Sequence, residues 1–411
     1  MISVRDALDR VLHDLPRLGA EQVPLTAARG RVLIEPIAAA YDVPPFRNSA
    51  MDGYAVQSAD LAAAGPEQPV RLRVLETVAA GSVARHAVRS GTATRIMTGA
   101  PVPDGADAVV KVEDTAEAGD DVAVRTAVRA GNNLRHPGED VRRGETVLEP
   151  GRWLRPADIG LIASLGVAMV RVARRPRVAI LSTGDELVDV GQPLGPGQIV
   201  NSNAYTLAAA VEELGGEARL TGIVRDRPEL IRAAFVDACT ADVVLSTGGV
   251  SVGNFDYVRQ ILADIGYAER FWKVAQKPGK PLTFGLVERT PVFGLPGNPV
   301  SSLVCFYLYV APALRQMMGL PNVHLPSAQA TLTDPLQKAG GLTEFVRCRL
   351  EGTPDDYRVR STGTQSSGVL RSLSLGDALI VGPADVTSLP AGARVRVVLL
   401  AADAAAAAPP F

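Results

Sequence analysis

The sequence predicts an α/β protein built from several domains. Its 411 residues exceed what one ordinary core holds, so two to four domains are expected. In the middle of the chain, apolar strand-like runs alternate with helical runs, which indicates a parallel sheet with helices on both faces. Before and after that region, short β-type runs alternate with Gly, Pro and Asp turns.

These patterns divide the chain into four predicted domains. The N-terminal stretch "MISVRDALDRVLHDL" has one apolar helical stripe, and "RPADIGLIASLG" is a second helical run that we expect to pack back on it. The β-rich part between them is then an insertion. The predicted domains are a helical domain (residues 1–43 plus 140–175), the inserted β-rich domain (44–139), a doubly wound α/β domain with a parallel-type sheet (176–322) and a small C-terminal β-barrel (323–411).

The composition excludes several classes of partner. A net charge of −2 and a pI near 6.2 give no general attraction to nucleic acid or to an anionic membrane. The basic run "RVARRPR" (171–177) lacks aromatic partners, so we interpret it as a solvated junction between domains and not as a nucleic-acid patch. The most apolar run, "VSSLVCFYLYVAPAL", is too short to span a membrane and contains Pro312.

The cysteines and histidines favour a reducing compartment. Cys239, Cys305 and Cys348 are widely separated and form no C-x-x-C pair, which argues against a disulfide framework or a structural zinc site. The 4 histidines are scattered, so we expect no His-rich transition-metal site. The N-terminal stretch has acids among its apolar residues, unlike a signal peptide. We therefore expect a soluble cytoplasmic protein.

Two predicted strands of the α/β region end alike, in "AILSTGDEL" (179–187) and "VVLSTGGVS" (243–251). Ligands of open α/β sheets bind beyond the carboxyl ends of strands, and glycine there lets backbone N–H groups approach a phosphate. Thr183, Gly248 and Gly249 are the candidate binding residues. One such turn alone would be ordinary strand-to-helix chemistry; the pair favours a ligand site. Neither is a G-x-G-x-x-G motif, so a nicotinamide-binding enzyme is disfavoured.

Carboxylates follow the predicted strands of the same region. Asp185 and Glu186 follow the first strand, Asp226 follows "TGIV", and Asp256 follows the "TGGVSVG" loop. Carboxylates in a shared crevice repel one another unless a hard cation such as Mg²⁺ lies among them. The alternative is helix capping, because "DRPE" (226–229) has the pattern of a capping box and Asp256 could cap the next helix.

A turn-rich stretch, "KPGKPLTFGLVERTPVFGLPGNPVSS" (277–302), contains two lysines around one turn. Its prolines and glycines predict a rigid, sharply turned segment. Lys277 and Lys280 either hold an anion or solvate a loop, and local chemistry alone leaves both open.

Three further loops combine glycine with hydroxyl or carboxylate groups. They are "PPFRNSAMDGYAV" (44–56), "IMTGAPVPDGADAVV" (96–110) and "HPGEDVRRGE" (136–145). Each alone passes as a surface turn, although the apolar setting of "NSAMDGYAV" is unusual for one.

Taken together and in order, these stretches closely resemble the MoeA family of molybdopterin molybdenumtransferases, which includes the E domain of gephyrin. The resemblance is carried by "PPFRNSAMDGYAV", "RIMTGAPVPDGADAVV", "GEDV", "STGDEL", "STGGVSVGNFDY", "KPGKPLTFG", "GLPGNPVS" and "TGTQSSGVL", and it covers nearly the whole chain. It implies an elongated homodimer of four-domain subunits. It also implies insertion of molybdate into adenylylated molybdopterin, with Mg²⁺-dependent cleavage of the pyrophosphate and release of AMP.

The resemblance also implies the roles of individual residues. The positions matching catalytic residues are Asp52, Thr98, Asp140, Glu186, Ser251 and Asp256. The positions expected to bind the substrates are Thr183, Asp226, Gly248, Gly249, Lys277, Lys280, Pro296, Pro299, Ser301, Arg347 and either Ser366 or, as our choice, Ser367. The expected Mg²⁺ ligands are Glu186, Asp226 and Asp256. In the family, the β-rich part of one subunit faces the α/β cleft of the other.

One departure and two alternatives accompany the resemblance. Relatives commonly have Asp where this chain has Asn201, so any contribution of that side chain is neutral here. A non-catalytic scaffold of the gephyrin type would have lost the acidic residues of the site, whereas this chain retains them. A tungstate-inserting enzyme stays open, because molybdate and tungstate have nearly the same size and charge. A transient contact with the molybdopterin adenylyltransferase is expected.

Overall fold

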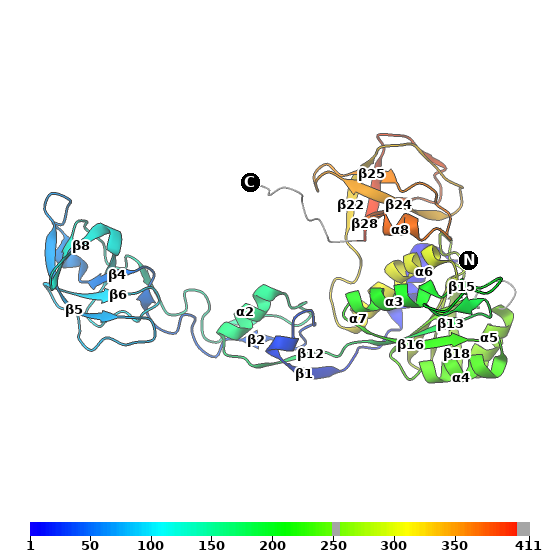
Figure 1. Ribbon diagram of the computed structural model, residues 1–411, viewed down its shortest axis with the longest axis horizontal. Helices are drawn as coiled ribbons and strands as arrows, with labels where there is room; N and C mark the ends of the chain where they lie inside the picture. Colours follow the sequence, from blue (N-terminus) through cyan, green and yellow to red (C-terminus); the bar gives the residue numbers. More distant parts are fainter. Residues whose placement is uncertain (249–254, 401–411) are drawn as a thin grey trace.

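The computed structural model describes residues 1–248 and 255–400, without the side chains of residues 255–257. The molecule is elongated (Figure 1): a β-rich sheet lies at one end, a small central part follows, and the α/β sheet and C-terminal barrel lie together at the other end. No helix within the described ranges is both long and apolar enough to cross a membrane.

The β-rich part is one sheet with a buried layer on each face. Its strand order is β7–β4–β6–β5–β9–β8. The strands are β4 (Gly53–Val56), β5 (Val70–Val78), β6 (Thr92–Ile96), β7 (Ala108–Lys111), β8 (Thr115–Ala118) and β9 (Asp121–Val124). Successive side chains alternate between the faces, so Tyr54 and Val56 enter one core while Ala55 enters the other. Beside this sheet, β3 (Asn48–Ser49) pairs with β10 (Leu134–Arg135).

The central part is built from two segments that flank the β-rich part in sequence. β1 (Ala20–Pro24) pairs antiparallel with β12 (Met169–Ala173), and β2 (Ile37–Ala38) pairs with β11 (Thr146–Leu148). The helix α2 (Pro156–Ser164) packs on the short turn η1 (Leu25–Ala27). The β-rich part is therefore an insertion between these two segments.

The N-terminal helix α1 (Val4–His13) packs in the α/β part, so the prediction that it packs against α2 is wrong. The buried Ala7 and Val11 of α1 share a core with the α/β helices, whereas Ile162 of α2 lies in a separate core. The N-terminus accordingly lies beside the α/β sheet (Figure 1). The predicted helical stripe is correct, but a stripe does not say which partner covers it. The central part thus consists of α2 and short strands and is not the helical domain that we expected.

The α/β part has a largely parallel sheet with the order β16–β13–β17–β21–β20–β18. Its strands are β13 (Arg177–Thr183), β16 (Glu217–Val224), β17 (Val243–Thr247), β18 (Tyr267–Trp272), β20 (Thr283–Val287) and β21 (Thr290–Leu295). β16, β13, β17 and β21 run parallel, and β20 and β18 add an antiparallel edge. The chain goes from β13 to β16 on one side and then to β17 on the other, so the strand order reverses beside β13.

Helices cover both faces of this sheet, as predicted. One face carries α1, α3 (Ser202–Glu213) and a continuous helical run of α6 (Pro299–Cys305), the π-helical η4 (Phe306–Val310) and α7 (Ala311–Met317). The other face carries α4 (Pro228–Ala238) and α5 (Phe255–Asp264). Val178 and Ile180 of β13 face the first core, and Ala179 and Leu181 face the second. This alternation explains why the strand is apolar throughout.

The predicted C-terminal barrel is confirmed. β24 (Thr343–Glu351), β25 (Arg358–Ser361), β22 (Ser327–Leu332), β28 (Arg394–Leu399) and β26 (Ala378–Gly382) pair in that order, and β26 pairs back with β24 to close the barrel. Outside the closed ring, β19 (Gln276–Lys277) pairs with β24, and β23 (Leu336–Gln337) pairs with β27 (Ser388–Leu389). The short helix α8 (Arg371–Ser374) packs on β24. Because β19 includes Lys277, the first residue of the turn-rich stretch, the barrel is joined directly to that stretch.

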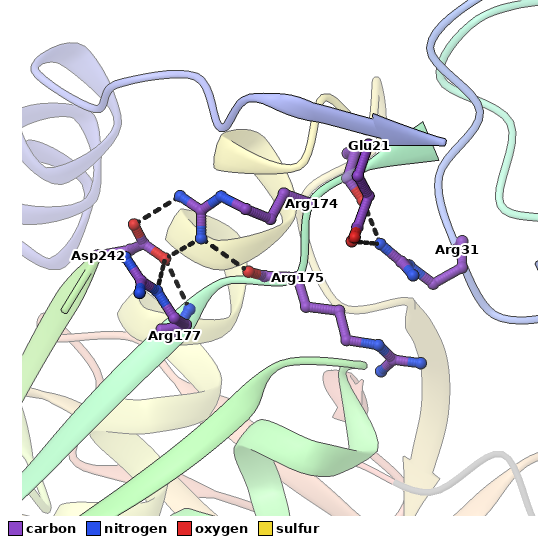
Figure 2. A network of polar contacts seen from close by, with 7 residues as sticks. Glu21, Arg31, Arg174, Arg175, Arg177 and Asp242 are labelled. Atoms are coloured by element: carbon purple, nitrogen blue, oxygen red, sulfur yellow. Dashed lines mark hydrogen bonds and ion pairs between the residues drawn. The ribbon is translucent and has the colours of Figure 1, made fainter. Parts of the chain in front are cut away.

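The basic run at 171–177 does form a junction, but its arginines are engaged and not simply solvated (Figure 2). Arg174 binds Asp242 through two hydrogen bonds of 2.7 Å, and the Arg177 backbone N–H donates to the same carboxylate. Arg175 donates to the carbonyl of Gly215. These contacts fasten the strand leaving the central part to the α/β sheet.

Candidate functional site

A cavity of about 870 Å³ opens where three distant segments of the chain meet. They are the carboxyl ends of the α/β strands, the segment of residues 276–281 that contains both predicted lysines (the basic loop), and the barrel loop 365–368. The sequence-predicted residues that line the cavity are Thr183, Glu186, Gly248, Lys277, Lys280, Pro296, Pro299, Ser301, Ser366 and Ser367. The structure therefore brings together residues that lie more than a hundred positions apart.

The floor of the cavity is formed by the ends of β13 and β17. Gly248 has φ +88°, and a Cβ there would lie 2.5 Å from the carbonyl oxygen of Thr183, so this position requires glycine. The Thr183 hydroxyl is buried and has no hydrogen-bond partner among the described residues. A buried hydroxyl without a partner is unfavourable, and a bound ligand could satisfy it.

Asn201 lies beside this floor and acts as the N-cap of α3. It is 5% exposed, and its side-chain oxygen accepts hydrogen bonds from the Ser182 hydroxyl at 3.2 Å and the Ala204 backbone N–H at 3.4 Å. The Ser182 hydroxyl also lies 3.2 Å from the Thr247 hydroxyl. An amide oxygen is sufficient for these contacts, so the neutral residue fits where relatives were expected to carry Asp.

The basic loop supplies both predicted lysines, but they differ in their surroundings. The ammonium of Lys277 lies 3.5 Å from the carboxylate of Glu344 in β24, and the Glu344 side chain is 7% exposed. Lys280 has no carboxylate within ion-pair distance in the part of the chain that the structure describes. Of the two, Lys280 therefore presents the less compensated charge to the cavity.

The barrel closes the cavity through the loop that follows β25. The Ser367 hydroxyl accepts from the Asn298 amide at 3.0 Å, and the Ser367 carbonyl accepts from the Val300 N–H at 3.2 Å. These bonds join the loop to the first turn of α6, where the buried Ser301 also lines the cavity. Ser367 is held by these contacts, whereas Ser366 is exposed.

Arg347 does not line the cavity, although it was expected among the binding residues. It is 1% exposed, and its guanidinium donates to the carbonyls of Thr364, Gln365 and Ser366 and to the Ser372 hydroxyl. In this structure Arg347 thus holds the barrel loop from behind.

Two of the predicted metal ligands, Glu186 and Asp226, follow the ends of the neighbouring strands β13 and β16. Burial, followed by the charges of Asp185 and Glu186, raises the pKa of Asp226 above its ordinary value. The N-cap of α4 is Arg227, so the capping-box interpretation of Asp226 and Glu229 is wrong. The crowded carboxylates offer the oxygen donors that Mg²⁺ prefers.

Three other predicted site residues, one of them a predicted metal ligand, fall wholly or in part outside the described part of the chain. Gly249 and Ser251 lie outside the described residues, and Asp256 is in the first turn of α5 with its side chain outside them. The described side chains contain no group of three or more His, Cys, Asp or Glu residues that could hold a metal ion.

Asp52, Thr98 and Asp140 do not line this cavity. Asp52 accepts hydrogen bonds of 2.7 Å from the backbone N–H and the hydroxyl of Thr98, and these bonds lower the pKa of Asp52. Both residues belong to the β-rich end of the molecule, remote from the α/β sheet (Figure 1). Asp140 is exposed where the chain re-enters the central part.

Several lining residues were not singled out from the sequence. Asn203 donates from its amide to the carbonyl of Gly297 at 2.8 Å and so joins α3 to the loop after β21. Gln276, Asn298 and Gln365 also line the cavity. In the sequence, only their position pointed to these residues, since they lie close to predicted residues or within quoted motifs.

Three family models match the chain in succession. The MoeA N-terminal region (domain I and II) matches residues 2–166, the "Probable molybdopterin binding domain" matches residues 179–316, and the MoeA C-terminal region (domain IV) matches residues 329–400.

Curated proteins and solved structures resemble the chain over nearly its full length. Molybdopterin molybdenumtransferase 2 of Mycobacterium tuberculosis is 42% identical over 385 residues, which cover 91% of this chain and 94% of that protein. Molybdopterin molybdenumtransferase of a Nostoc species is 39% identical over 97% of this chain and 94% of its own. The crystal structure of the molybdopterin biosynthesis moeA protein from Pyrococcus horikoshii OT3 superimposes with a TM-score of 0.83 at 34% identity, covering 97% of this chain and 100% of that one.

Proposed function

This chain belongs to the MoeA family, and on that premise we propose that it is a molybdopterin molybdenumtransferase. It inserts molybdate into the dithiolene of adenylylated molybdopterin, while the pyrophosphate bond breaks and AMP leaves. The observation that carries this proposal is the meeting of Thr183, Lys280 and Ser301 in one cavity. A dianion and a pyrophosphate need cations and hydroxyl donors, and that cavity supplies both.

The basic loop and the two serine-bearing segments hold the oxyanion. Lys280 and Ser301 contact molybdate, with Ser367 completing the set from the barrel side. A lysine about 4 Å from an anion contributes roughly 1 kcal/mol in water and roughly 4 kcal/mol at an effective dielectric of 20, so closure of the cavity by the barrel loop strengthens the contact. Pro296 and Pro299 shape the connection between β21 and α6, since their backbone nitrogens carry no proton to donate.

The carboxylates at the strand ends form the part of the site that would bind a cation. Glu186, Asp226 and Asp256 would hold Mg²⁺ through their carboxylate oxygens. In support, burial and the charges of Asp185 and Glu186 raise the pKa of Asp226, as expected where a cation is needed to offset crowded carboxylates. Bound there, Mg²⁺ would neutralise charge that develops on the phosphates as the anhydride breaks. Thr183 and Gly248 position the phosphate end of the substrate through a hydroxyl and a closely approaching backbone.

The working form is a homodimer in which the β-rich part of one subunit serves the cavity of the other. The support for this arrangement is that the β-rich sheet, next to which Asp52 and Thr98 lie in the chain, is at the opposite end of the molecule from the α/β sheet (Figure 1), and that neither residue lines the cavity. The Asp52 carboxylate, held ionised by Thr98, then faces the substrate from the second subunit. We place the protein in the cytoplasm, in agreement with its free thiols, where it receives substrate from the molybdopterin adenylyltransferase.

The test is reconstitution. Pure protein is mixed with adenylylated molybdopterin, Mg²⁺ and molybdate, and AMP release and metal-loaded cofactor are followed, with tungstate in a parallel reaction. We expect both products from the wild type and a large loss in Asp256→Asn. If the wild type yields neither product, or if Asp256→Asn matches it, the proposal fails.

A further inference from the structure

A row of side chains on the helix after β21 lies behind the basic loop. Ser301, Cys305 and Tyr309 are four positions apart, so they lie on one side of the helix. Ser301 lines the cavity, while Cys305 and Tyr309 are fully buried. Tyr309 belongs to the π-helical η4, and π-helical turns inside α-helices are rare and frequent at functional sites.

Gln276 connects this row to the loop. Its side chain accepts a hydrogen bond from the Tyr309 hydroxyl and donates to the carbonyl of Pro278 at 3.0 Å and to the sulfur of Cys305 at 3.6 Å. The Cys305 thiol donates in turn to the carbonyl of Gly279 at 3.7 Å. Burial raises the pKa of both Cys305 and Tyr309, so both keep their protons and act as donors.

These hydrogen bonds end on Pro278 and Gly279, the two residues between Lys277 and Lys280. Gly279 has φ +96°, and a Cβ there would lie 2.4 Å from the Cys305 sulfur and 2.5 Å from the Gln276 amide nitrogen. The loop backbone therefore rests directly on the polar groups and has no room to shift toward them. Ordinary core packing would not require three linked polar side chains here, because buried polar groups are unfavourable unless each is satisfied.

We propose that Tyr309, acting through Gln276, is a positioning residue that holds the loop between Lys277 and Lys280 at the oxyanion site. The inference rests on the proposed function, since it assumes that these lysines bind the anion. Tyr309 does not line the cavity and exerts its effect through the backbone of the loop.

The test compares Tyr309→Phe with Tyr307→Phe, a matched control two positions away in the same π-helical segment. The Tyr307 hydroxyl makes no hydrogen bond to a described residue, so this control removes an oxygen without breaking a bond. Molybdate affinity is measured by calorimetry, KM and kcat by AMP release, and folding by thermal unfolding. We expect Tyr309→Phe to raise the Kd and KM for molybdate about 3- to 10-fold, the range for loss of one hydrogen bond, with kcat changed less than about twofold. Tyr307→Phe should match the wild type.

A Tyr309→Phe protein that is less stable but binds molybdate with the wild-type Kd would overturn the inference and leave Tyr309 as a core residue. If that variant does not fold, Gln276→Met replaces it, with the same expectation for the Kd and KM and the same overturning result. Failure of the proposed function looks different, because the wild type itself would then release no AMP.

Discussion

The two lysines of the basic loop provide a quantitative test of the oxyanion site. Lys277 is paired with the buried carboxylate of Glu344, and its own side chain is 53% exposed. Lys280 is exposed, lines the same cavity and has no such partner among the described residues. The perturbation is therefore a pair of single substitutions, Lys277→Ala and Lys280→Ala, made in otherwise identical protein.

The structure sets the expected difference between them. A lysine about 4 Å from an anion contributes about 1 kcal/mol in water and about 4 kcal/mol at an effective dielectric of 20; Lys280 is exposed, which favours the lower half of that range. A loss of about 1.5–2 kcal/mol corresponds to a rise in Kd of about 10- to 30-fold. The charge of Lys277 is largely offset by Glu344, so we expect Lys277→Ala to raise the Kd by about threefold or less.

The assay is calorimetric titration of each variant with molybdate at low and at moderate ionic strength, with thermal unfolding recorded in parallel. The effect of Lys280→Ala should shrink as salt is added, because exposed charges are screened. Equal losses for the two variants, or a larger loss for Lys277→Ala, would refute the reasoning. A fall in stability that parallels the loss of binding in Lys280→Ala would make the loop a structural element.

Three further predictions follow from individual contacts. Gly279→Ala should weaken molybdate binding and lower the free energy of unfolding by about 1–3 kcal/mol, because the methyl group would overlap Cys305 at a positive φ; binding and unfolding both unchanged would contradict this. Asp226→Asn should raise the Tm at neutral pH, because burial and neighbouring acids raise the pKa of Asp226 and its ionised form therefore destabilises the fold. This gain should disappear as the pH falls below the ordinary carboxyl range, and Mg²⁺ should raise the Tm of the wild type more than that of the variant; a gain independent of pH would contradict the assignment. Burial raises the pKa of Asp242, but hydrogen bonds from Arg174 outweigh it and hold the pKa below its ordinary value. Asp242→Asn should therefore lower the free energy of unfolding by about 1–3 kcal/mol at neutral pH, and the difference from the wild type should fade in acid; chemical denaturation at several pH values measures it.

Local patterns were sufficient to predict the α/β sheet and the barrel. Strand and helix alternate visibly between residues 176 and 322, and the ends of β13 and β17 carry the Ser-Thr-Gly runs that the structure places in one cavity floor. The rule that parallel strands end at one edge turned two separate motifs into one candidate site.

What the sequence did not predict depends on contacts between distant segments. The apolar stripe of α1 was visible, but its partner was not, because many faces could bury the same side chains. A motif match placed Arg347 in the binding set without showing that its guanidinium turns toward the backbone of residues 364–366. Tyr309 lies in an apolar run typical of a core helix, so nothing in the sequence singled it out. Only the fold brings it to Gln276.

The central claim is that molybdate binds in the cavity between the basic loop, α6 and the barrel loop. Anomalous diffraction at the molybdenum edge, from crystals of the protein grown with molybdate, tests it most directly. The account predicts a molybdenum peak within hydrogen-bond reach of the Lys280 ammonium and the Ser301 hydroxyl, and loss of that peak in Lys280→Ala. A well-occupied peak elsewhere on the molecule, with none in this cavity, would contradict it.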